Sequence, residues 1–371
     1  MPVTRICSYI LLVPVLAAMA GPVVAQNIES LARSEQELVK LVEKLSPQVA
    51  AITAWREVAV PEDPPAKKTD KGRTILLPVR GSGCVVSRDG WILTNEHVIR
   101  QTKGVQVMLW DGREFEAKVL GADGRSDLAV LKIPARDLVP VQFGDLSTVR
   151  RGQWALAMGN PLGMAFDGQS AVSLGIVSGI GRHVPKIDLK EDRYYGNLIL
   201  TSAPINIGNS GGPLFDLSGR VIGITTIIST TEAGGSQMGF AVPVDAWTRQ
   251  MVDRLGRGEM IEYGYIGVSL AARPGRTGAF VEDVLAGTPA DKGQLRVNDL
   301  IVAFNGQKIT GADHLILLIG RTIPGKLMVL HVVRDGKAVD VTLTSARRKD
   351  FVHVPAAPAE WPELKSHEKT R

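Results

Sequence analysis

One serine lies among small residues in the stretch INIGNSGGPLFD, residues 205–216. A serine hydroxyl is a poor nucleophile until a base takes its proton, and the oxyanion formed on attack needs hydrogen-bond donors. Glycines allow the backbone to turn sharply, which would aim amides at one point. Ser210 is therefore a candidate nucleophile, although a structural turn explains this motif alone equally well.

The base that activates such a serine has to be one of six histidines. His97 comes at the end of an apolar run, GWILTNEHVI, in the part of the chain that is rich in short β-type runs. We take His97 as the candidate base, although in isolation a structural histidine would be the simpler interpretation. The others lie in a polar loop, in a later unit and in the C-terminal tail: His183, His314, His331, His353 and His367.

A carboxylate should orient the imidazole of that base. Asp127, in SDLAVLKI, leads directly into an apolar strand, where it could be buried beside a histidine. A role as a turn or strand-start residue is the alternative for Asp127. Asp111 and Asp123 are each followed by glycine and are better explained as turn residues.

The order histidine, aspartate, serine is that of the two-barrel, chymotrypsin-type architecture. An α/β-hydrolase would require the serine first and a helix directly after it. Here Pro213 and the strand-like LFDLSGRVIGI follow the serine. Order and local structure therefore both favour the chymotrypsin-type arrangement.

The elements that must hold these side chains are many short strands. From Val79 onwards, runs such as GSGCVVS, GWILTN, LAVLKI, WALAMG and GRVIGITTII alternate with glycine and aspartate turns. The pattern predicts a mainly β fold, a chymotrypsin-like double β-barrel. DAWTRQMVDRLG then predicts a closing helix with Asp245 as its N-cap.

Several motifs in the same order along the chain resemble the HtrA/Deg family of secreted serine proteases. They are GSGCVVSRDGWILTNEHVI, SDLAVLKI, ALAMGNPLGM, VSLGIVSGIGR and TSAPINIGNSGGPLFDLSGRVIGI, within residues 30–349. The resemblance implies that His97 is the general base, Asp127 its orienting partner and Ser210 the nucleophile. It also implies an oxyanion hole at Gly208, Asn209 and Ser210, with the amides of Gly208 and Ser210 as donors.

The chain departs from the usual family sequence TDAAINPGNSGG at Ser202, Pro204 and Ile207. These changes alter the approach to the nucleophile and leave the three candidate catalytic residues in place. Asn209 stands where many digestive-type relatives carry aspartate, which argues against activation through a freed N-terminus. We expect a loop rearrangement to activate the enzyme instead.

GYIGVSL through VTLTSA is similar to the single PDZ domain that follows the protease domain in this family. Tyr265, Ile266, Gly267 and Val268 would form its carboxylate-binding loop, in which backbone amides hold the terminal carboxylate of a peptide that adds as a strand. An ordinary turn before a strand is the alternative for this tetrapeptide. The helical ADHLILLIG would line the groove.

The first 25 residues contain one early arginine, an apolar run and a small-residue end. Val23 and Ala25 would occupy the −3 and −1 positions of a signal-peptidase site. The alternative is an uncleaved membrane anchor, because residues 6–25 carry no charge and are just long enough to span a bilayer. After cleavage only Cys84 would remain, so no internal disulfide is expected.

These observations predict the following organisation: a signal peptide or anchor (1–25), an N-terminal helical segment and first strand (26–56), a mobile loop (57–78), the protease domain (79–258), the PDZ domain (262–347) and a disordered tail (350–371).

Composition excludes several other functions. The net charge of +5 is spread along the chain, and the one tight basic run, Arg347-Arg348-Lys349, fits a solvated surface better than nucleic-acid binding. Phosphate-loop, dinucleotide and zinc-helix patterns are absent from the sequence. We therefore expect no metal, no cofactor and no nucleic-acid partner.

The sequence thus predicts a periplasmic, ATP-independent serine endopeptidase that degrades unfolded or misfolded proteins in envelope quality control and stress response. Ile205, Ile227 and Ile228 would line its primary pocket and favour aliphatic residues before the cleaved bond. Its partners would be unfolded substrates and C-terminal peptides, and the resemblance implies a homotrimer. The alternative function is a peptide-binding chaperone or scaffold with a silent protease fold.

Overall fold

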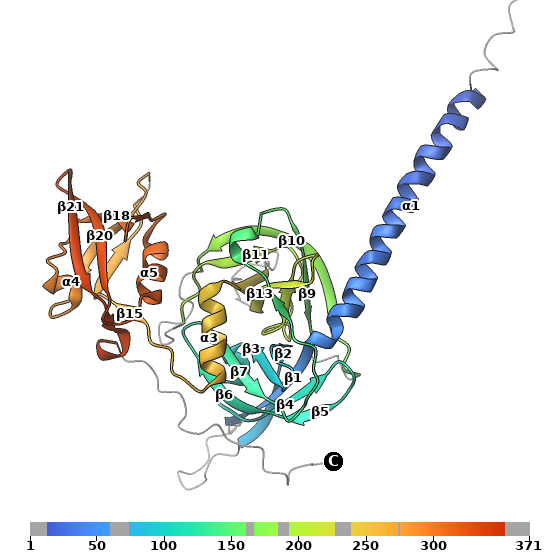
Figure 1. Ribbon diagram of the computed structural model, residues 1–371, viewed down its shortest axis with the longest axis horizontal. Helices are drawn as coiled ribbons and strands as arrows, with labels where there is room; N and C mark the ends of the chain where they lie inside the picture. The colour runs from blue at the N-terminus through green and yellow to red at the C-terminus, as the bar shows by residue number, and fades with distance from the viewer. Residues whose placement is uncertain are drawn as a thin grey trace, which may run out of the picture. The chain divides into compact units, whose positions relative to one another are not determined.

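The structure is a computed structural model that describes residues 13–59, 74–160, 167–184, 193–226, 239–273 and 275–352. The chain divides into two compact units, Met1–Ser46 and Pro47–Arg371. The first unit contains helix α1 (Val13–Leu45), and the second contains all the strands. Figure 1 shows the elements coloured along the chain.

Helix α1 ends at Leu45. A short 3-10 turn, η1 (Ser46–Gln48), follows Leu45, because Pro47 lacks the amide that a continuing helix needs. In the part of the chain that the structure describes, no helix combines the length and the apolar character needed to cross a membrane. Residues 1–12 lie outside the described residues, so the signal peptide or anchor stays a prediction.

The first sheet of the second unit has seven strands in the order β5-β4-β1-β2-β3-β7-β6. Its interior is aliphatic, and Ile52, Val107 and Leu131 are fully buried there. Helix α2 (Glu96–Ile99) follows β3. The strands are β1 (Val49–Ala59), β2 (Thr74–Val85), β3 (Trp91–Thr94), β4 (Thr102–Leu109), β5 (Glu114–Glu116), β6 (Lys118–Asp123) and β7 (Leu128–Lys132).

The second sheet also has seven strands, in the order β12-β9-β10-β11-β14-β13-β8, and a further β12–β13 pairing closes it into a barrel. Ile199, Leu214 and Ala241 are fully buried inside. The 3-10 turn η2 (Leu146–Thr148) follows β8. The strands are β8 (Gln142–Phe143), β9 (Trp154–Gly159), β10 (Ala171–Arg182), β11 (Leu198–Thr201), β12 (Pro213–Phe215), β13 (Arg220–Thr226) and β14 (Gly239–Pro243).

Helix α3 (Ala246–Gly256) begins as predicted, because the Asp245 side chain accepts a hydrogen bond from the Thr248 amide at 2.9 Å. The helix packs against β6 and β7 of the first sheet. At Gly121 of β6 a methyl group would lie 2.5 Å from the carbonyl oxygen of Leu255, so the helix backbone approaches this strand closely.

The C-terminal part forms its own core around Ile301, Leu315 and Leu330. Its main sheet has the order β16-β17-β18-β20-β21, and α5 coincides with the predicted groove helix. Residues 353–371, most of the predicted tail, lie outside the described residues. The elements are β15 (Gly264–Tyr265), β16 (Val268–Ala271), β17 (Ala279–Val284), α4 (Pro289–Lys292), β18 (Leu300–Phe304), β19 (Gln307–Lys308), α5 (Ala312–Arg321), β20 (Leu327–Arg334), β21 (Lys337–Thr344), β22 (Ala346–Arg347) and η4 (Arg348–Asp350).

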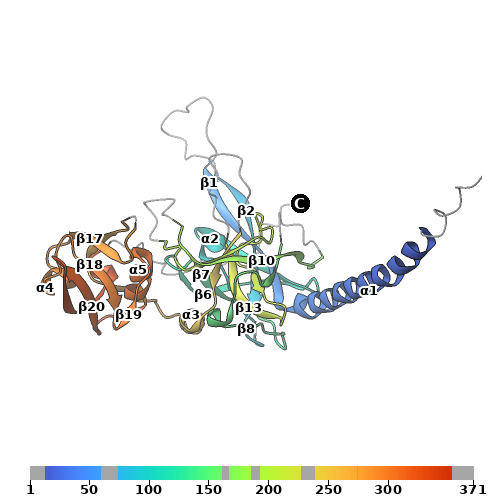
Figure 2. The ribbon, with the colours of Figure 1, turned by 90° about the horizontal axis from the view of Figure 1, so that it is seen from above.

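The predicted loop at 57–78 is wrong at both ends, because residues 57–59 and 74–78 belong to β1 and β2. The two strands pair continuously from Val49↔Cys84 to Ala59↔Thr74 and extend as an arm (Figure 2). Pro78 is tolerated because β3 pairs only with Cys84 and Val85, which leaves the outer side of β2 unpaired at the proline. Residues 60–73 lie outside the described residues.

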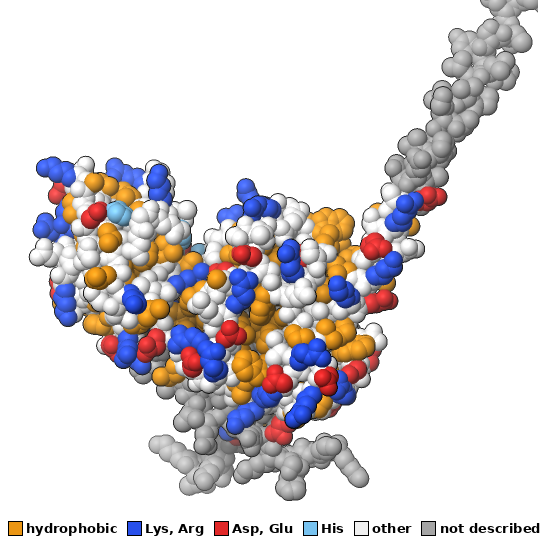
Figure 3. All heavy atoms as spheres, in the orientation of Figure 1, with side chains coloured by type: hydrophobic (Ala, Val, Ile, Leu, Met, Phe, Trp, Pro, Cys, Tyr) orange, Lys and Arg blue, Asp and Glu red, His pale blue; other side chains and the backbone are white. Residues whose placement is uncertain are grey.

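One cysteine is enclosed in the first sheet. Cys84 of β2 has no exposed surface and forms no disulfide. Burial raises the pKa of its thiol to about 12. On the face shown in Figure 3, basic and acidic side chains are interspersed, as expected for a solvated surface.

We expect Gly121→Ala to destabilise the protease part by roughly 1–3 kcal/mol, because the added methyl group would meet the backbone of α3. Urea unfolding followed by tryptophan fluorescence would measure the change. Gly124→Ala is the matched control, since its methyl group would meet nothing closer than 3.7 Å. Equal losses in both variants would contradict this account of the packing.

Candidate active site

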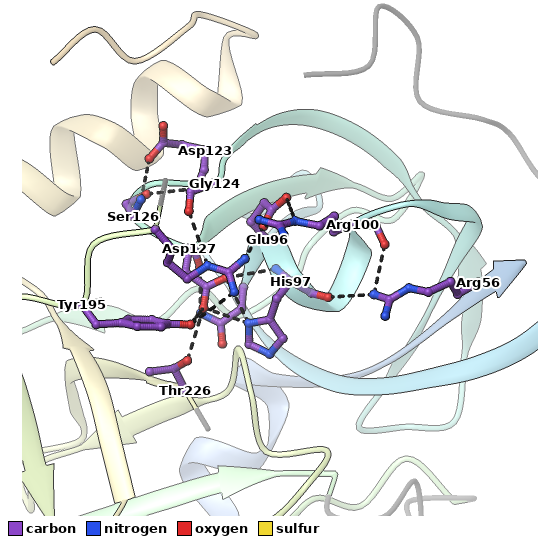
Figure 4. Close-up of polar contacts among 12 residues, drawn as sticks. Arg56, Glu96, His97, Arg100, Asp123, Gly124, Ser126, Asp127, Tyr195 and Thr226 are labelled. Carbon is purple, nitrogen blue, oxygen red and sulfur yellow. Dashed lines mark hydrogen bonds and ion pairs between the residues drawn. The ribbon is translucent and has the colours of Figure 1, made fainter. Parts of the chain in front are cut away.

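The structure joins His97 and Asp127, which are thirty residues apart, in one partly buried contact (Figure 4). His97 lies on α2 and Asp127 in the turn between β6 and β7. His97 Nδ1 is 2.8 Å from Asp127 Oδ2 and 3.0 Å from Oδ1, and the His97 amide donates to Oδ1 at 3.0 Å. The carboxylate therefore fixes both the ring and the backbone of the histidine.

The backbone at Asp127 is in the left-handed region, with φ of 60°. Aspartate tolerates this conformation better than most residues. The carbonyl of Asp127 accepts hydrogen bonds from the Glu96 amide at 3.1 Å and from Asn95 Nδ2 at 2.8 Å. These bonds hold the turn against the start of α2 and so set the direction of the carboxylate.

Asp127 is ionised although it has no exposed surface. Burial raises the pKa of this carboxyl, but the charge and hydrogen bonds of His97, together with the charge of Arg193, outweigh burial and hold the pKa at about 2. An ionised carboxylate accepts the proton on Nδ1, which leaves Nε2 of the neutral ring unprotonated. The arrangement can therefore present Nε2 as a base.

Two hydroxyl groups also donate to Asp127 Oδ2. Tyr195 Oη lies at 3.1 Å and Thr226 Oγ1, at the end of β13, at 3.3 Å. Both come from the second barrel, so the carboxylate lies where the two sheets meet. Neither residue was anticipated, because no spacing in the sequence connects Tyr195 or Thr226 with His97.

Ser210 lies in the turn between β11 and β12 and is 4% exposed. Its carbonyl accepts a hydrogen bond from the Ser82 amide at 2.8 Å, which attaches the turn to β2. Gly211 has φ of 88°, and a side chain there would collide with the Ser82 carbonyl and the Thr94 hydroxyl. Since β3 ends at Thr94, the Ser210 turn packs against the strand that leads into the helix of His97.

The residues before Ser210 form a tight turn in which the Asn209 amide donates to the Asn206 carbonyl at 3.0 Å. Gly208 has φ of 100°, as the third position of a type II turn requires. Among the contacts of the described residues, the amides of Gly208 and Ser210 donate to no acceptor. Asn209 is buried, and its side-chain oxygen has no hydrogen-bond partner among the described residues.

Ser82, which the sequence offered no reason to select, supports this turn. Its hydroxyl donates to the Gly208 carbonyl at 2.7 Å and accepts from the Asn160 amide at 2.8 Å. The side chain has no exposed surface. Ser82 therefore ties the first sheet to the turn that precedes Ser210.

The predicted primary pocket is described only in part. Ile205 is 5% exposed and belongs to the core of the second barrel, beside Gly239. Ile227 and Ile228 lie outside the described residues. The pocket therefore stays a prediction.

The predicted carboxylate-binding loop is built on β15 and β16. Ile266 is 2% exposed in the C-terminal core, and Gly267 has φ of 82°. Val268 begins β16, an edge strand whose partner among the described strands is β17. The ring of Tyr265 stacks on Phe351 at 5.5 Å. An edge strand beside this loop has backbone groups to which an extended peptide could add.

The other histidines have separate surroundings. His183 lies beside Tyr194, His314 Nδ1 accepts from the Thr310 amide, and His331 lies 2.6 Å from Asp340. His353 and His367 are outside the described residues. The side chain of Asp111 accepts from the Arg113 amide and that of Asp123 from the Ser126 amide, so both serve in turns as predicted.

Family models match both parts of the chain. A trypsin-like peptidase domain model matches residues 81–224, and a PDZ domain model matches residues 264–344. A probable periplasmic serine endoprotease, DegP-like, of Chlamydia trachomatis is 38% identical over 276 residues, which cover 72% of this chain and 54% of that relative. The similarly named protein of Ectopseudomonas mendocina is 36% identical over 327 residues, 85% of this chain and 64% of the relative. The chain spans about half the length of the first of these relatives.

Solved structures match most of the chain. The HtrA-type protease AlgW with a tripeptide is 30% identical with a TM-score of 0.67, and the match covers 84% of this chain and 97% of that one. The serine endoprotease from Yersinia pestis is 28% identical with a TM-score of 0.58, covering 83% of this chain and 96% of that one. The predicted fold class is confirmed, and the protease part consists of one closed barrel and one half-barrel.

The lowered pKa of Asp127 predicts how stability depends on pH. Because folding lowers this pKa from 3.8 to about 2, the stabilisation by ionised Asp127 is complete above about pH 4 and is lost as the pH falls towards 2. The advantage of the parent over Asp127→Asn should shrink by roughly 2 kcal/mol across this window. Urea unfolding at several pH values would measure it.

Asp123 provides a control of opposite sign. Burial raises the pKa of this carboxyl, so the parent should gain stability relative to Asp123→Asn as the pH falls through that raised pKa towards 3.8. Parallel pH profiles for the two variants would contradict the assigned environments.

Proposed function

This chain belongs to the HtrA-type, DegP-like family of serine proteases, and we propose that it is an exported serine endopeptidase with His97, Asp127 and Ser210 as its catalytic triad. The observation that carries the proposal is the contact between His97 and the buried Asp127, next to which the Ser210 turn packs against the end of β3. The matching domain and the solved relatives support the same assignment.

In the proposed reaction, His97 Nε2 takes the proton of Ser210 Oγ as the hydroxyl attacks a peptide carbonyl carbon. The carbonyl oxygen becomes an oxyanion, which the amides of Gly208 and Ser210 stabilise. His97 then gives its proton to the leaving amine, and an acyl-enzyme remains on Ser210. Water hydrolyses the acyl-enzyme by the same route and restores the hydroxyl. Asp127 stays ionised and holds the imidazole in place.

The proposed substrates are unfolded or misfolded proteins, degraded without ATP during envelope quality control. The periplasmic names of the relatives support that compartment for this chain. The free edge of β16 and the peptides in solved relatives support binding of C-terminal peptides by the PDZ domain. This binding would regulate the protease.

A homotrimer is part of the proposal. Trp154 of β9 and the alternate residues Val172, Leu174 and Ile176 of β10 are between 39% and 50% exposed. Trp154 pairs with Ile176 across the two strands, so the four side chains provide an apolar surface that another copy could cover.

We expect Ser210→Ala to lower turnover of unfolded casein by about 10⁴ to 10⁶-fold, because the nucleophile is lost while the small side chain is kept. Far-ultraviolet circular dichroism should be unchanged. Ser218→Ala is the matched control, since Ser218 lies exposed in the turn between β12 and β13 and should leave turnover unchanged. Cleavage at the parent rate by Ser210→Ala would contradict the assignment.

Covalent labelling of the serine distinguishes an active protease from a peptide-binding scaffold with a silent protease fold. A fluorophosphonate should modify Ser210 in the parent and should not modify the Ser210→Ala variant. Absence of labelling in the parent, with and without added C-terminal peptides, would favour the scaffold.

Peptide binding should depend on a free terminal carboxylate. A peptide with a hydrophobic C-terminal residue should bind about 10 to 100-fold more tightly than its amidated form, because charge-assisted hydrogen bonds to backbone amides are lost on amidation. Gly267→Ala should weaken binding of the peptide that has a free carboxylate, since the added methyl group would collide with Thr288. Gly275→Ala has a similar φ of 76° without the collision and should bind normally in fluorescence anisotropy. Equal affinity of the parent for the free and the amidated peptide would contradict binding of a terminal carboxylate by the PDZ domain.

A further inference from the structure

A short segment before β11, residues 193–197, brings two side chains to the catalytic carboxylate. Its backbone is fixed at both sides, because the Tyr194 amide donates to the Arg125 carbonyl and the Tyr195 carbonyl accepts from the Val184 amide, each at 2.9 Å. Arg125 lies in the same β6–β7 turn as Asp127. The segment is thus attached to the turn that contains the carboxylate.

Tyr195 reaches Asp127 directly. Its hydroxyl donates to Oδ2 at 3.1 Å, the same oxygen that lies 2.8 Å from His97 Nδ1 (Figure 4). Burial and the charge of Asp127 raise the pKa of the Tyr195 hydroxyl, so it stays protonated and can donate. The hydroxyl therefore restrains Oδ2, whereas the His97 amide donates to Oδ1.

Arg193 joins the two acidic residues beside His97. Its Nη2 lies 2.7 Å from Glu96 Oε2 and 3.5 Å from Asp127 Oδ1, and its side chain is 10% exposed. The guanidinium also lies over the Tyr195 ring at 5.8 Å. A nearly buried cation thus contacts both the carboxylate of the proposed triad and the residue that immediately precedes its histidine.

We propose that Arg193 and Tyr195 are positioning residues for the catalytic carboxylate, so that the segment before β11 sets the orientation of Asp127 and, through it, of His97. This inference rests on the proposed endopeptidase function. Neither side chain touches the reacting atoms, so both act through Asp127.

Other charged side chains lie near Glu96, Asp127 and Arg193, and they determine how each substitution changes the charge around His97. On α2, Glu96 is paired with Arg100 at 2.9 Å as well as with Arg193. On β1, the Arg56 guanidinium donates to the carbonyls of His97 and Arg100. On the β6–β7 turn, Asp123 is engaged with Ser126. Loss of Arg193 therefore removes the arginine that lies 3.5 Å from Asp127 Oδ1 and leaves this carboxylate with less compensation for its charge.

Tyr195→Phe isolates the hydroxyl. We expect kcat on a peptide substrate to fall about 3 to 10-fold with KM nearly unchanged, because one hydrogen bond to the carboxylate is lost while the ring is kept. Tyr194→Phe is the matched control. Its hydroxyl bonds a different acceptor, the carbonyl of Asp313, and its loss should leave kcat within about 2-fold of the parent.

Arg193→Gln tests the charge. Removing a cation close to the imidazolium makes protonation of the ring easier, so the acid limb of the kcat/KM profile should move to higher pH by about 0.5 to 1 unit. kcat at the optimum should fall about 10 to 100-fold. Arg193→Lys keeps the charge and should restore the position of the acid limb, although the bridging contacts are only partly replaced.

Glu96→Gln tests whether Arg193 positions Asp127 or only neutralises the charge of Glu96. If Arg193 serves only to neutralise that carboxylate, the double variant Glu96→Gln, Arg193→Gln should regain the activity of Glu96→Gln. If Arg193 positions Asp127, the double variant should keep most of the loss caused by Arg193→Gln. Circular dichroism and urea unfolding identify any variant that does not fold. If the Arg193 variants do not fold, the kcat of Tyr195→Phe alone tests the inference.

The inference is overturned if Tyr195→Phe and Arg193→Gln keep parent kcat and an unmoved acid limb, or if the double variant regains activity. Parent enzyme without peptidase activity would instead contradict the proposed function, and labelling of Ser210 records that outcome separately. A lowered kcat with a shifted acid limb, together with a persistent loss in the double variant, supports positioning.

Discussion

An ionised carboxylate without solvent beside an imidazole is the contact on which the rest of the structure depends. Asp127 has no exposed surface and still keeps its pKa at about 2, because His97 and Arg193 provide opposite charge and several donors surround its oxygens. Losing any of these partners would leave a buried charge less compensated. The left-handed turn at Asp127, the start of α2 and the segment before β11 all serve to keep this carboxylate satisfied.

The second requirement is that the turn of the proposed nucleophile, in the second barrel, be held against the first sheet. Ser82 does this through its amide to the Ser210 carbonyl and its hydroxyl to the Gly208 carbonyl. Gly211 permits the approach, since any side chain there would collide with β2 and the end of β3. Residues of both sheets therefore define the geometry around the serine, while each sheet keeps its own aliphatic core.

The sequence identified the strand-rich fold and the His97–Asp127 pair because local patterns record them: short apolar runs, the turn glycines and the order of three residue types. It missed the β1–β2 arm, since prolines and charges in 57–78 indicated a loop while cross-strand pairing makes strands of both ends. It also missed Ser82, Arg193 and Tyr195. Their roles arise from contacts between segments far apart in the chain, such as Ser82 with Gly208, which single-sequence patterns do not record.

The enclosed thiol of Cys84 has a consequence for the proposed export of this chain. With its pKa raised to about 12, the thiol stays protonated at neutral pH, whereas the thiolate is the form that attacks disulfides or oxidants. For the exported protease proposed above, folded Cys84 would therefore form no mixed disulfides with substrates in an oxidising compartment. If its substrates are unfolded chains with exposed cysteines, as proposed, the enzyme would in this way avoid becoming covalently trapped on them.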